Sequence, residues 1–446
     1  MPRARTTAAL FFAFALCGCR RYSREPVTVT FLDPEWLHDS NTATSGLSGS
    51  LRKRRLISDT ALQEFSQETE IQVKHLPTPE NPRDQLILIR SLLQNGSVTP
   101  DVYAIDVIWP GMLNQYLVDL KPYFASQLRS ENREVLANYT VQDQLAAMPY
   151  HAHTGVLFYR TDLLHKYGYS RPPETWDELE KMALRIQEGE RAQGEKDFWG
   201  YVWPGAAKEG LLCNALEWQF DEGGGRIIED NKKISVNNPA AIRSWERAAH
   251  WLGWISPSSV TAYQELDAGN IFWISGKAAF FRGWASSDFL REPPDVPFRD
   301  RGGVTSVPGG NFARGGTVGG YGLAVSRWSA HPAESIRLIE SLRRREDEIR
   351  ASLPPAEPSP RQEMYELPIL LSEGGLSAGG EKPGSRILAR PSKVTGANYD
   401  DVAEAYIQAV HGVLTGKSTA PAAAAALEKQ LVRITGFETG RPAKEF

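Results

Sequence analysis

The stretch Asp101-Val-Tyr-Ala-Ile-Asp-Val-Ile-Trp-Pro-Gly-Met-Leu113 decides the fold class of this chain. Residues 102–105 have the apolar, β-favouring character of a buried strand, and Asp106 follows where that strand ends. Pro110 stands as at the first turn of a helix. In open α/β sheets, ligands lie beyond the carboxyl ends of the strands. Asp106 is therefore predicted to face a ligand, with the large Trp109 close behind it.

The segments around this stretch alternate between strand and helix patterns. Before it, strands are predicted at 27–31 and 71–75, and helices around 62–65 and 83–94, which favours a mostly parallel sheet. Further along, we predict the strands 156–159, 234–236 and 278–282, and a strand pair, 304–307 with 321–325, joined by a Gly-rich turn. Helices are predicted from a capping box at Thr175 and Glu178, at 239–251 and 332–342, and around 427–434. The stretch 352–384 is expected to be irregular.

The length and net charge of the chain indicate how many domains it has and which kinds of partner it binds. The chain has 446 residues, so two domains of roughly 200 residues each are expected. Its formal net charge of −4 gives no indication of a polyanionic partner, and no nucleic acid is expected. The short basic run 51–55 is interpreted as a solvated surface segment. Gly315–Gly322 resembles a phosphate-binding loop, but strand residues follow it and no helix opens there, so no nucleotide cofactor is predicted.

The N-terminus reads as a targeting segment. A basic head and a short apolar run precede Leu16-Cys-Gly-Cys19, which matches a bacterial lipobox. The match implies a signal peptide over 1–18, lipidation of Cys19 and a tether over 19–26, anchoring the protein to a membrane. A plain secretory signal is the alternative. Of the three cysteines, only Cys213 would then remain free, so no disulfide is expected and Cys213 should be a small buried side chain.

Several stretches occur in the order found in the extracellular solute-binding proteins of family 1, which deliver sugars to ABC importers. Besides residues 101–124, these are the stretches 155–164, 173–179, 197–203, 209–218 and 390–399. The chain resembles the trehalose/maltose-binding branch of that family from about Thr28 to Ile434. The resemblance implies a periplasmic binding protein type II-like α/β fold, with two lobes of mixed sheets, a hinge, and the ligand in the cleft between the lobes. Carried over, lobe 1 would be 27–150 and 320–350, and lobe 2 would be 151–319 and 351–446.

The resemblance also implies a set of ligand-binding residues. Sugar hydroxyls pair well with carboxylates and guanidinium groups, whereas the C–H faces of a sugar stack on aromatic rings. The matching positions supply both kinds of group: Glu35, Asp106, Trp284, the backbone amides of Gly319 and Gly320, Tyr321 and Arg390. Alternative interpretations remain for Asp106 as a helix cap, for Trp284 as a core residue, for Arg390 as a surface ion pair, and for residues 315–322 as a flexible connection. Glu35 matches more loosely.

Two histidines depart from the pattern of the relatives. His153 stands where an Asp is usual, and His151 stands where an aromatic residue is common. A neutral imidazole donates one hydrogen bond and accepts one, whereas a carboxylate accepts several. The sugar bound here is therefore expected to differ in its hydroxyl pattern. The spacing would also suit two metal ligands on one strand face, but no third ligand accompanies them, so no metal is predicted. Ser286 and Tyr321 also differ from the usual residues.

The sequence thus predicts a monomeric binding lipoprotein of the periplasm or cell surface that is not an enzyme. Its expected partners are a sugar, a disaccharide of the trehalose/maltose type, and the ABC permease with its cytoplasmic ATPase. Two alternatives remain: a ligand-sensing lipoprotein that reports to a membrane receptor, and a carbohydrate-active enzyme with paired carboxylates. The sequence does not identify the sugar.

Overall fold

The computed structural model describes residues 26–34, 38–39, 57–79, 81–129, 131, 133–284, 301–351 and 385–443. Several predictions lie outside the described residues: Glu35, the lipidation site Cys19 with its signal segment 1–18, the basic run 51–55, Ser286, and the irregular stretch 352–384. Within the described part of the chain, no helix is both long and apolar enough to cross a lipid bilayer.

One large mixed sheet runs through the molecule in the strand order β4-β1-β5-β12-β8-β10-β9. Strands β1, β4 and β5 pair in parallel, whereas β12 is antiparallel to β5 and to β8. Two further strands join at the sides, β11 along β8 and β13 along β12. The bounds are β1 Thr28–Pro34, β4 Gln72–Thr78, β5 Val102–Asp106, β8 Met148–Arg160, β9 Trp199–Val202, β10 Ala278–Trp284, β11 Gly302–Ser306, β12 Arg314–Val325 and β13 Ser385–Leu388.

Short strands form two small separate sheets within the described residues. These are β2 His38–Asp39 with β3 Ile57–Ser58, and β6 Thr140–Val141 with β7 Gln144–Leu145. Short 3-10 helices cover Asn114–Tyr116, Gln127–Arg129, Ser258–Ala262 and Gly396–Asn398.

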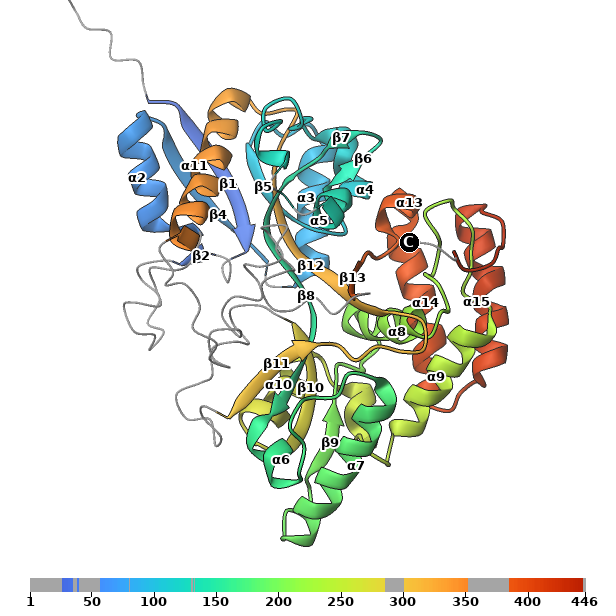
Figure 1. Ribbon diagram of the computed structural model, residues 1–446. Coiled ribbons are helices and arrows are strands. Elements are labelled where there is room, and N and C mark those ends of the chain that lie inside the picture. Colours follow the sequence, from blue (N-terminus) through green and yellow to red (C-terminus); the bar gives the residue numbers. More distant parts are fainter. Residues whose placement is uncertain are drawn as a thin grey trace, which may run out of the picture.

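The helices gather into three groups (Figure 1). Around β1, β4 and β5 lie α2 Asp59–Thr69, α3 Pro82–Gln94, α4 Pro110–Leu113, α5 Arg133–Tyr139 and α11 Pro332–Ala351. Around β9, β10 and β11 lie α6 Thr161–Lys166, α7 Trp176–Ala192 and α10 Glu265–Trp273. To the right of Figure 1 lie α8 Glu209–Asp221, α9 Pro239–Trp251, α13 Ser392–Thr395, α14 Tyr399–Leu414 and α15 Ala420–Thr435.

Local sequence signals explain where many helices begin. Asn81 accepts a hydrogen bond from the amide of Arg83 at the start of α3, and Pro82 fills the first helical position. The Thr175 hydroxyl accepts from the Glu178 amide at the start of α7, as predicted. Asn238 caps α9 in the same way. These caps satisfy amides that have no partner inside the helix, and each contributes about 1 kcal/mol.

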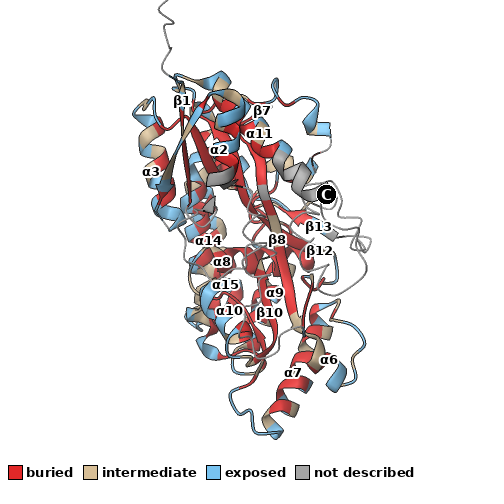
Figure 2. Ribbon diagram, turned by 90° about the vertical axis from the view of Figure 1, so that its left-hand side faces the viewer, coloured by how far each residue is buried: buried red, intermediate tan, exposed pale blue. Residues whose placement is uncertain are grey.

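Strands β8 and β12 connect the two parts of the sheet. The first half of β8 pairs with β12, and the second half pairs with β10 and β11. Figures 1 and 2 show β8 as one long strand that runs from the upper group of elements into the lower group. Most of its described residues are buried, and His153 and Thr154 near its middle are only partly buried, as the red and tan parts of the ribbon in Figure 2 indicate. The fold is therefore the predicted two-lobed α/β arrangement, with these strands passing between the lobes.

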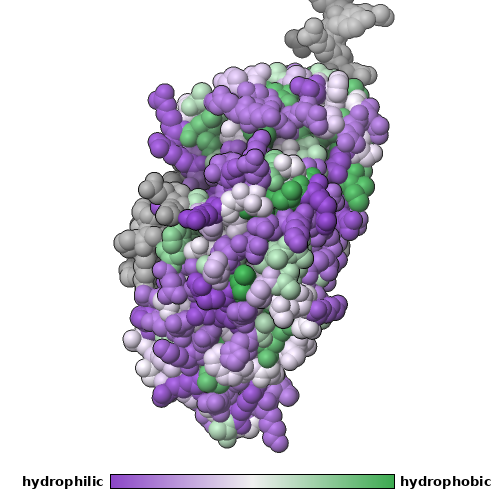
Figure 3. All heavy atoms as spheres, turned by 90° about the vertical axis from the view of Figure 1, so that its right-hand side faces the viewer, coloured by the Kyte–Doolittle hydropathy of each residue, from purple (hydrophilic) through white to green (hydrophobic). Residues whose placement is uncertain are grey.

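The outer surface is mainly hydrophilic where Figure 3 shows it. This face, over α9, α14 and α15, carries apolar residues only in small separate areas. Large apolar side chains of these helices, such as Trp245, Val410 and Leu431, are fully buried. Cys213 is also fully buried, as predicted, and burial raises the pKa of its thiol to about 12.

Two strand predictions were wrong. Residues 234–236 form only isolated bridges, from Ile234 to Ile228 and to Thr439. The strands near 304–307 and 321–325 exist, but they do not pair with each other: β11 pairs with β8, and β12 lies between β5 and β8. Between them, 314–320 is strand rather than a Gly-rich turn.

The glycines of β12 have a packing reason. A Cβ at Gly315 would meet the Phe220 ring at 2.7 Å, and one at Gly322 would meet Tyr139 at 2.5 Å. Neighbouring side chains thus occupy the space that side chains on β12 would need. The Gly-rich composition marks close approach of other elements to a strand, not a flexible turn.

Helix α8 packs against β12 and carries a buried ion pair. Its residues 210–221 are all buried. Glu217 of α8 pairs with Arg282 of β10, with Oε1 at 2.5 Å from Nη2, and neither side chain is exposed. Gly155 of β8 faces this pair, because a Cβ there would lie 2.2 Å from Glu217 Oε1 and 2.3 Å from Arg282 Nη2.

We predict that Gly155→Ala destabilises the protein by about 1–3 kcal/mol, because the added methyl group forces a locked ion pair to move. Urea unfolding followed by circular dichroism measures this change. Gly412→Ala is the matched control: nothing lies within 4 Å of a Cβ there, and alanine in α14 should stabilise by about 0.5–1 kcal/mol. Equal stability of Gly155→Ala and the wild type would contradict the prediction.

Candidate ligand-binding site

The register of four neighbouring strands places most of the predicted site residues on one face of the sheet. Asp106 of β5 lies opposite Tyr321 of β12, and Gly319 of β12 lies opposite His153 of β8. Trp284 of β10 lies opposite Gly155, two residues beyond His153. Residues directly opposite each other, and residues two apart along a strand, share a face. Asp106, Tyr321, Gly319, His153 and Trp284 therefore follow one another across a single face.

His151 and Gly320 also belong to this region of the sheet. The backbone of His151 lies opposite Tyr321 in the register. Gly320 lies opposite Ala152 and accepts a hydrogen bond from the amide of Val107 at 2.9 Å. Gly320 has a φ of +126°, which a residue with a side chain rarely adopts. Its place in β12 excludes the interpretation of 315–322 as a flexible connection.

Asp106 ends β5 as predicted, but it does not cap the helix that follows. Its Oδ1 accepts a hydrogen bond from the amide of Ile108 at 3.1 Å, closing a tight turn. Helix α4 begins after Trp109 without a side-chain cap. The Asp106 side chain is 18% exposed. Burial raises the pKa of its carboxyl to about 6, although Arg390 and the Ile108 amide lower it. Asp106 is thus a carboxyl group held at the sheet edge in a poorly solvated position.

Arg390 follows β13 and lies buried, 5% exposed, beside Asp106. Its Nη2 donates to the backbone oxygen of Val318 at 3.0 Å and lies 3.8 Å from Asp106 Oδ1. Its Nη1 donates to Glu209 Oε1 at 3.0 Å. Its Nε is buried without a hydrogen-bond partner among the described residues. The guanidinium is therefore a fixed, incompletely satisfied donor, which contradicts the interpretation of Arg390 as a surface ion pair.

Trp284 lies at the other end of this face, and His153 packs against it. The two rings meet edge to face, with centroids 5.1 Å apart and planes at 77°. A Cβ at Gly319 would lie 2.6 Å from His153 Nε2 and 3.2 Å from Trp284 Cζ3. Gly319 therefore leaves the space in which the imidazole and the indole come together. Trp284 is partly exposed, at the end of its strand.

Tyr321 is more enclosed than its predicted role as a stacking platform requires. Only 4% of the residue is exposed. Its hydroxyl donates to Gln85 Oε1 of α3 at 3.1 Å, and its ring meets the Trp109 ring edge to face at 6.1 Å. Burial, followed by the charge of Asp106, raises the pKa of its hydroxyl well above its usual value. In this conformation Tyr321 is a buried side chain that packs beside Asp106, beneath the surface of the candidate site.

Three polar residues of this region, Glu209, Tyr399 and Tyr139, were not predicted as site residues. Glu209, the first residue of α8, binds Arg390 and also accepts a hydrogen bond from the Tyr399 hydroxyl. Tyr139 is fully buried, and its hydroxyl has no hydrogen-bond partner among the described residues. It is close enough to Asp106 for the carboxylate charge to help raise the pKa of its phenol, after burial itself. Glu209 and Tyr399 fall within the stretches 209–218 and 390–399, which was the one available signal.

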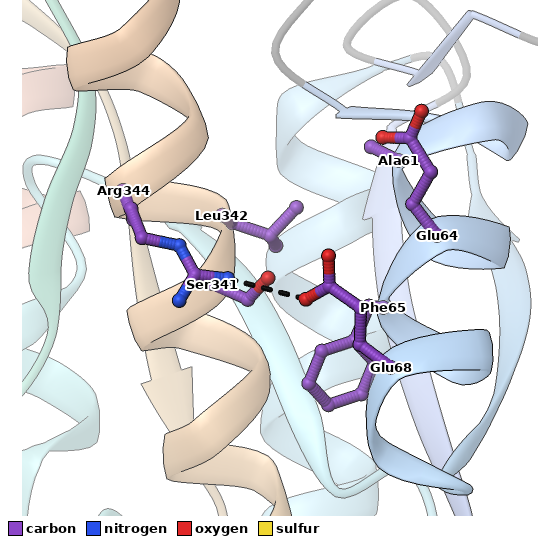
Figure 4. A pocket seen from close by; sticks show the side chains of 7 residues that line it. All are labelled: Ala61, Glu64, Phe65, Glu68, Ser341, Leu342 and Arg344. Carbon is purple, nitrogen blue, oxygen red and sulfur yellow. Dashed lines mark hydrogen bonds and ion pairs between the residues drawn. The ribbon is translucent and has the colours of Figure 1, made fainter.

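A cavity of about 250 Å³ lies away from this face, between α2 and α11. Figure 4 shows Phe65 and Leu342 at its base and an ion pair at its rim, where Glu68 and Arg344 lie 3.3 Å apart. Its rim charges are exposed, and none of the predicted site residues lines it. In the part of the chain that the structure describes, no cluster of three or more His, Cys, Asp or Glu residues is arranged to hold a metal ion.

Asp106→Asn should change how stability depends on pH. The pKa of Asp106 in the folded protein is about 6, above its ordinary value of 3.8, so the folded state keeps a proton that the unfolded chain releases. The stability from this proton is present below pH 3.8 and is lost as pH rises through 6. Between pH 4 and 7.5, the free energy of unfolding of Asp106→Asn should therefore rise by on the order of 2 kcal/mol relative to that of the wild type. Urea unfolding of both proteins at each pH measures this difference. A difference that stays constant with pH would contradict a raised pKa.

Comparison with known proteins identifies the family. The bacterial extracellular solute-binding proteins match residues 56–347. A probable ABC transporter-binding protein of Deinococcus radiodurans is 37% identical over 366 residues, which are 82% of this chain and 87% of that protein. The maltose-bound MalE3 of T. maritima superposes with a TM-score of 0.71 at 27% identity, covering 92% of this chain and 100% of the other. A Thermotoga lettingae solute-binding protein bound with α-D-tagatose superposes with a TM-score of 0.69 at 18% identity, covering 92% of this chain and 100% of the other. This match shows that the two chains share a fold. As the resemblance of its sequence predicted, this chain belongs to the bacterial extracellular solute-binding proteins.

Proposed function

We propose that this chain captures a sugar, a disaccharide of the trehalose/maltose type, and delivers it unchanged to an ABC permease. The observation that carries the proposal is the single sheet face that joins Asp106 and Arg390 at one end to Trp284 at the other. Members of this family bind solutes, and both solved relatives described above are named with a bound sugar.

The chemistry of this face suits a polyhydroxylated ligand. Asp106 supplies acceptor oxygens, and the Arg390 Nε supplies a buried donor that has no hydrogen-bond partner in the described part of the chain. Hydrogen bonds to ionised groups are the stronger ones. Trp284 supplies a flat apolar surface for C–H groups. His153 adds one donor and one acceptor at most. Because these groups extend from β5 to β10, across four neighbouring strands spaced about 4.8 Å apart, a ligand longer than one sugar ring fits them best.

Binding would close the two lobes over the ligand. We place the lobe boundaries at 150/151 and 319/320, within β8 and β12, and at 350/351. A small change of bend in these two strands would move Asp106 and Trp284 relative to each other, because they lie on opposite sides of the crossing. A ligand that contacts both would favour the closed form. The amides of Gly319 and Gly320, and the side chains of Glu35 and His151, complete the proposed site.

The function is tested by a thermal-shift screen with monosaccharides, disaccharides and polyols, followed by calorimetry. A sugar at 100 times its Kd stabilises the folded state by about 2.7 kcal/mol, which raises the Tm. We expect a disaccharide to give the largest shift. If no sugar or polyol changes the Tm, the proposed function is wrong.

Trp284→Ala should weaken binding of that sugar by at least about 30-fold, because a central stacking residue is removed. The Tm without ligand should change little, since the ring is partly exposed. Trp328→Ala is the matched control, because Trp328 is 43% exposed and lies beside Leu93, away from the site. Unchanged affinity together with a large loss of Tm in Trp284→Ala would place Trp284 in the core instead.

The membrane anchor is a separate proposal, supported by the lipobox Leu16-Cys-Gly-Cys19. We propose that the mature chain begins at Cys19 and is held to the membrane by its lipid, as a monomer in the periplasm or at the cell surface. Cys19→Ser should abolish the incorporation of labelled palmitate and release the protein from the membrane fraction. Cys17→Ser is the control and should leave labelling intact. Normal labelling of Cys19→Ser would exclude this anchor.

A further inference from the structure

A buried arginine lies directly against the proposed stacking tryptophan. The guanidinium carbon of Arg282 is 4.2 Å from the centre of the Trp284 ring. The two residues are next-but-one neighbours on β10 and therefore share a face. His153 meets the same indole at 5.1 Å in an edge-to-face contact. Arg282 thus lies over one face of the Trp284 ring, and the proposed sugar contact uses the other face.

Arg282 is itself held by contacts that fix the plane of its guanidinium. Its Nε donates to Glu217 Oε2 at 3.1 Å and its Nη2 to Glu217 Oε1 at 2.5 Å, a two-point pair. Nη2 also donates to the Thr317 hydroxyl at 2.9 Å. Glu217 Oε1 in turn accepts from the backbone amide of Thr317 at 2.9 Å and from its hydroxyl at 2.6 Å. The side chains of Arg282 and Glu217 are both fully buried.

These contacts join β10, α8 and β12, near the point where β12 passes from one lobe to the other. Arg282 comes from β10, Glu217 from α8 and Thr317 from β12. Gly155 of β8 makes room for the pair, since a Cβ there would lie within 2.3 Å of both partners. The position of Trp284 is therefore tied to both strands that run from one lobe to the other.

The shape of the arginine side chain matters for this arrangement. A planar guanidinium can stack on an aromatic face while its edge binds a carboxylate at two points, whereas a lysine ammonium cannot do both. A cation is attracted to the negative face of an indole, and this attraction is stronger when water is excluded. Glu217 balances the charge, so the Arg282 contact orients the ring without placing an unpaired charge in the core.

We propose that Arg282 and Glu217 act as a positioning pair for ligand binding: they hold the Trp284 ring at the angle at which the face away from Arg282 stacks on a sugar. This inference rests on the proposed function. It assigns the pair a role in affinity beyond its contribution to folding, although neither residue reaches the ligand.

The test combines two substitutions so that no buried charge is left unpaired. Arg282→Met with Glu217→Gln keeps the volumes and leaves an acceptor for the Thr317 amide. Arg282→Lys is the second variant, which keeps the charge and loses the planar stack. The matched control is Arg343→Met with Glu131→Gln, because that buried ion pair has side chains only 8% and 3% exposed. The proteins are full-length mature chains labelled with 5-fluorotryptophan.

The first readout is the ¹⁹F resonance of Trp284, assigned by its loss in Trp284→Phe. It needs no ligand. We expect the resonance to shift and broaden in both Arg282 variants and to stay unchanged in the control pair, even where the control loses stability. The second readout is the Kd for maltose by calorimetry. We expect about a tenfold weakening in the double variant, and less in Arg282→Lys.

The outcomes separate this inference from the proposed function. An unmoved Trp284 resonance in the Arg282 variants overturns the inference. So does a wild-type Kd in the double variant when Trp284→Ala weakens binding, and the proposed function then stands. Binding that is unaffected by Trp284→Ala instead removes the proposed site. If the double variant does not fold, the resonance of Arg282→Lys decides.

Discussion

The pairing of β8 with β12 is the contact on which the rest of the molecule depends. One half of β8 holds β12 beside β5, and the other half holds β10 and β11. A slip of one residue in this register would place His153 and Gly319 on opposite faces, and Asp106 and Trp284 would then no longer share a face. The glycines of β12 permit the pairing, because side chains at Gly319 or Gly322 would collide with neighbouring rings.

Charged groups along this face are stabilised by one another more than by water. Arg390 lies between Asp106 and Glu209, and Arg282 is paired with Glu217. Such groups are costly to bury, and Asp106 keeps a raised pKa even beside an arginine. A binding site needs polar groups that are already fixed and only partly satisfied before the ligand arrives. The Nε of Arg390, which has no hydrogen-bond partner among the residues that the structure describes, is a group of this kind.

Sequence reasoning located the groups that have local signals. Asp106 was proposed because it ends an apolar strand, and Trp284 because it matches the stacking tryptophan of the family that the sequence resembles. Glu209 was missed because its role depends on Arg390, which is 181 residues further along the chain. Helix α8 was also missed. It is buried all round, so its sequence lacks the one-sided apolar pattern by which a surface helix is recognised.

The sequence by itself determined most of the individual strands, the helix cap at Thr175, and the order of motifs that identifies the family. These features depend on residues close together in the chain. Only the tertiary structure decided which strands pair, that 314–320 is a central strand, and that Arg282 lies against Trp284. Such contacts join distant segments, and their energies depend on packing and burial that no local pattern of residues contains.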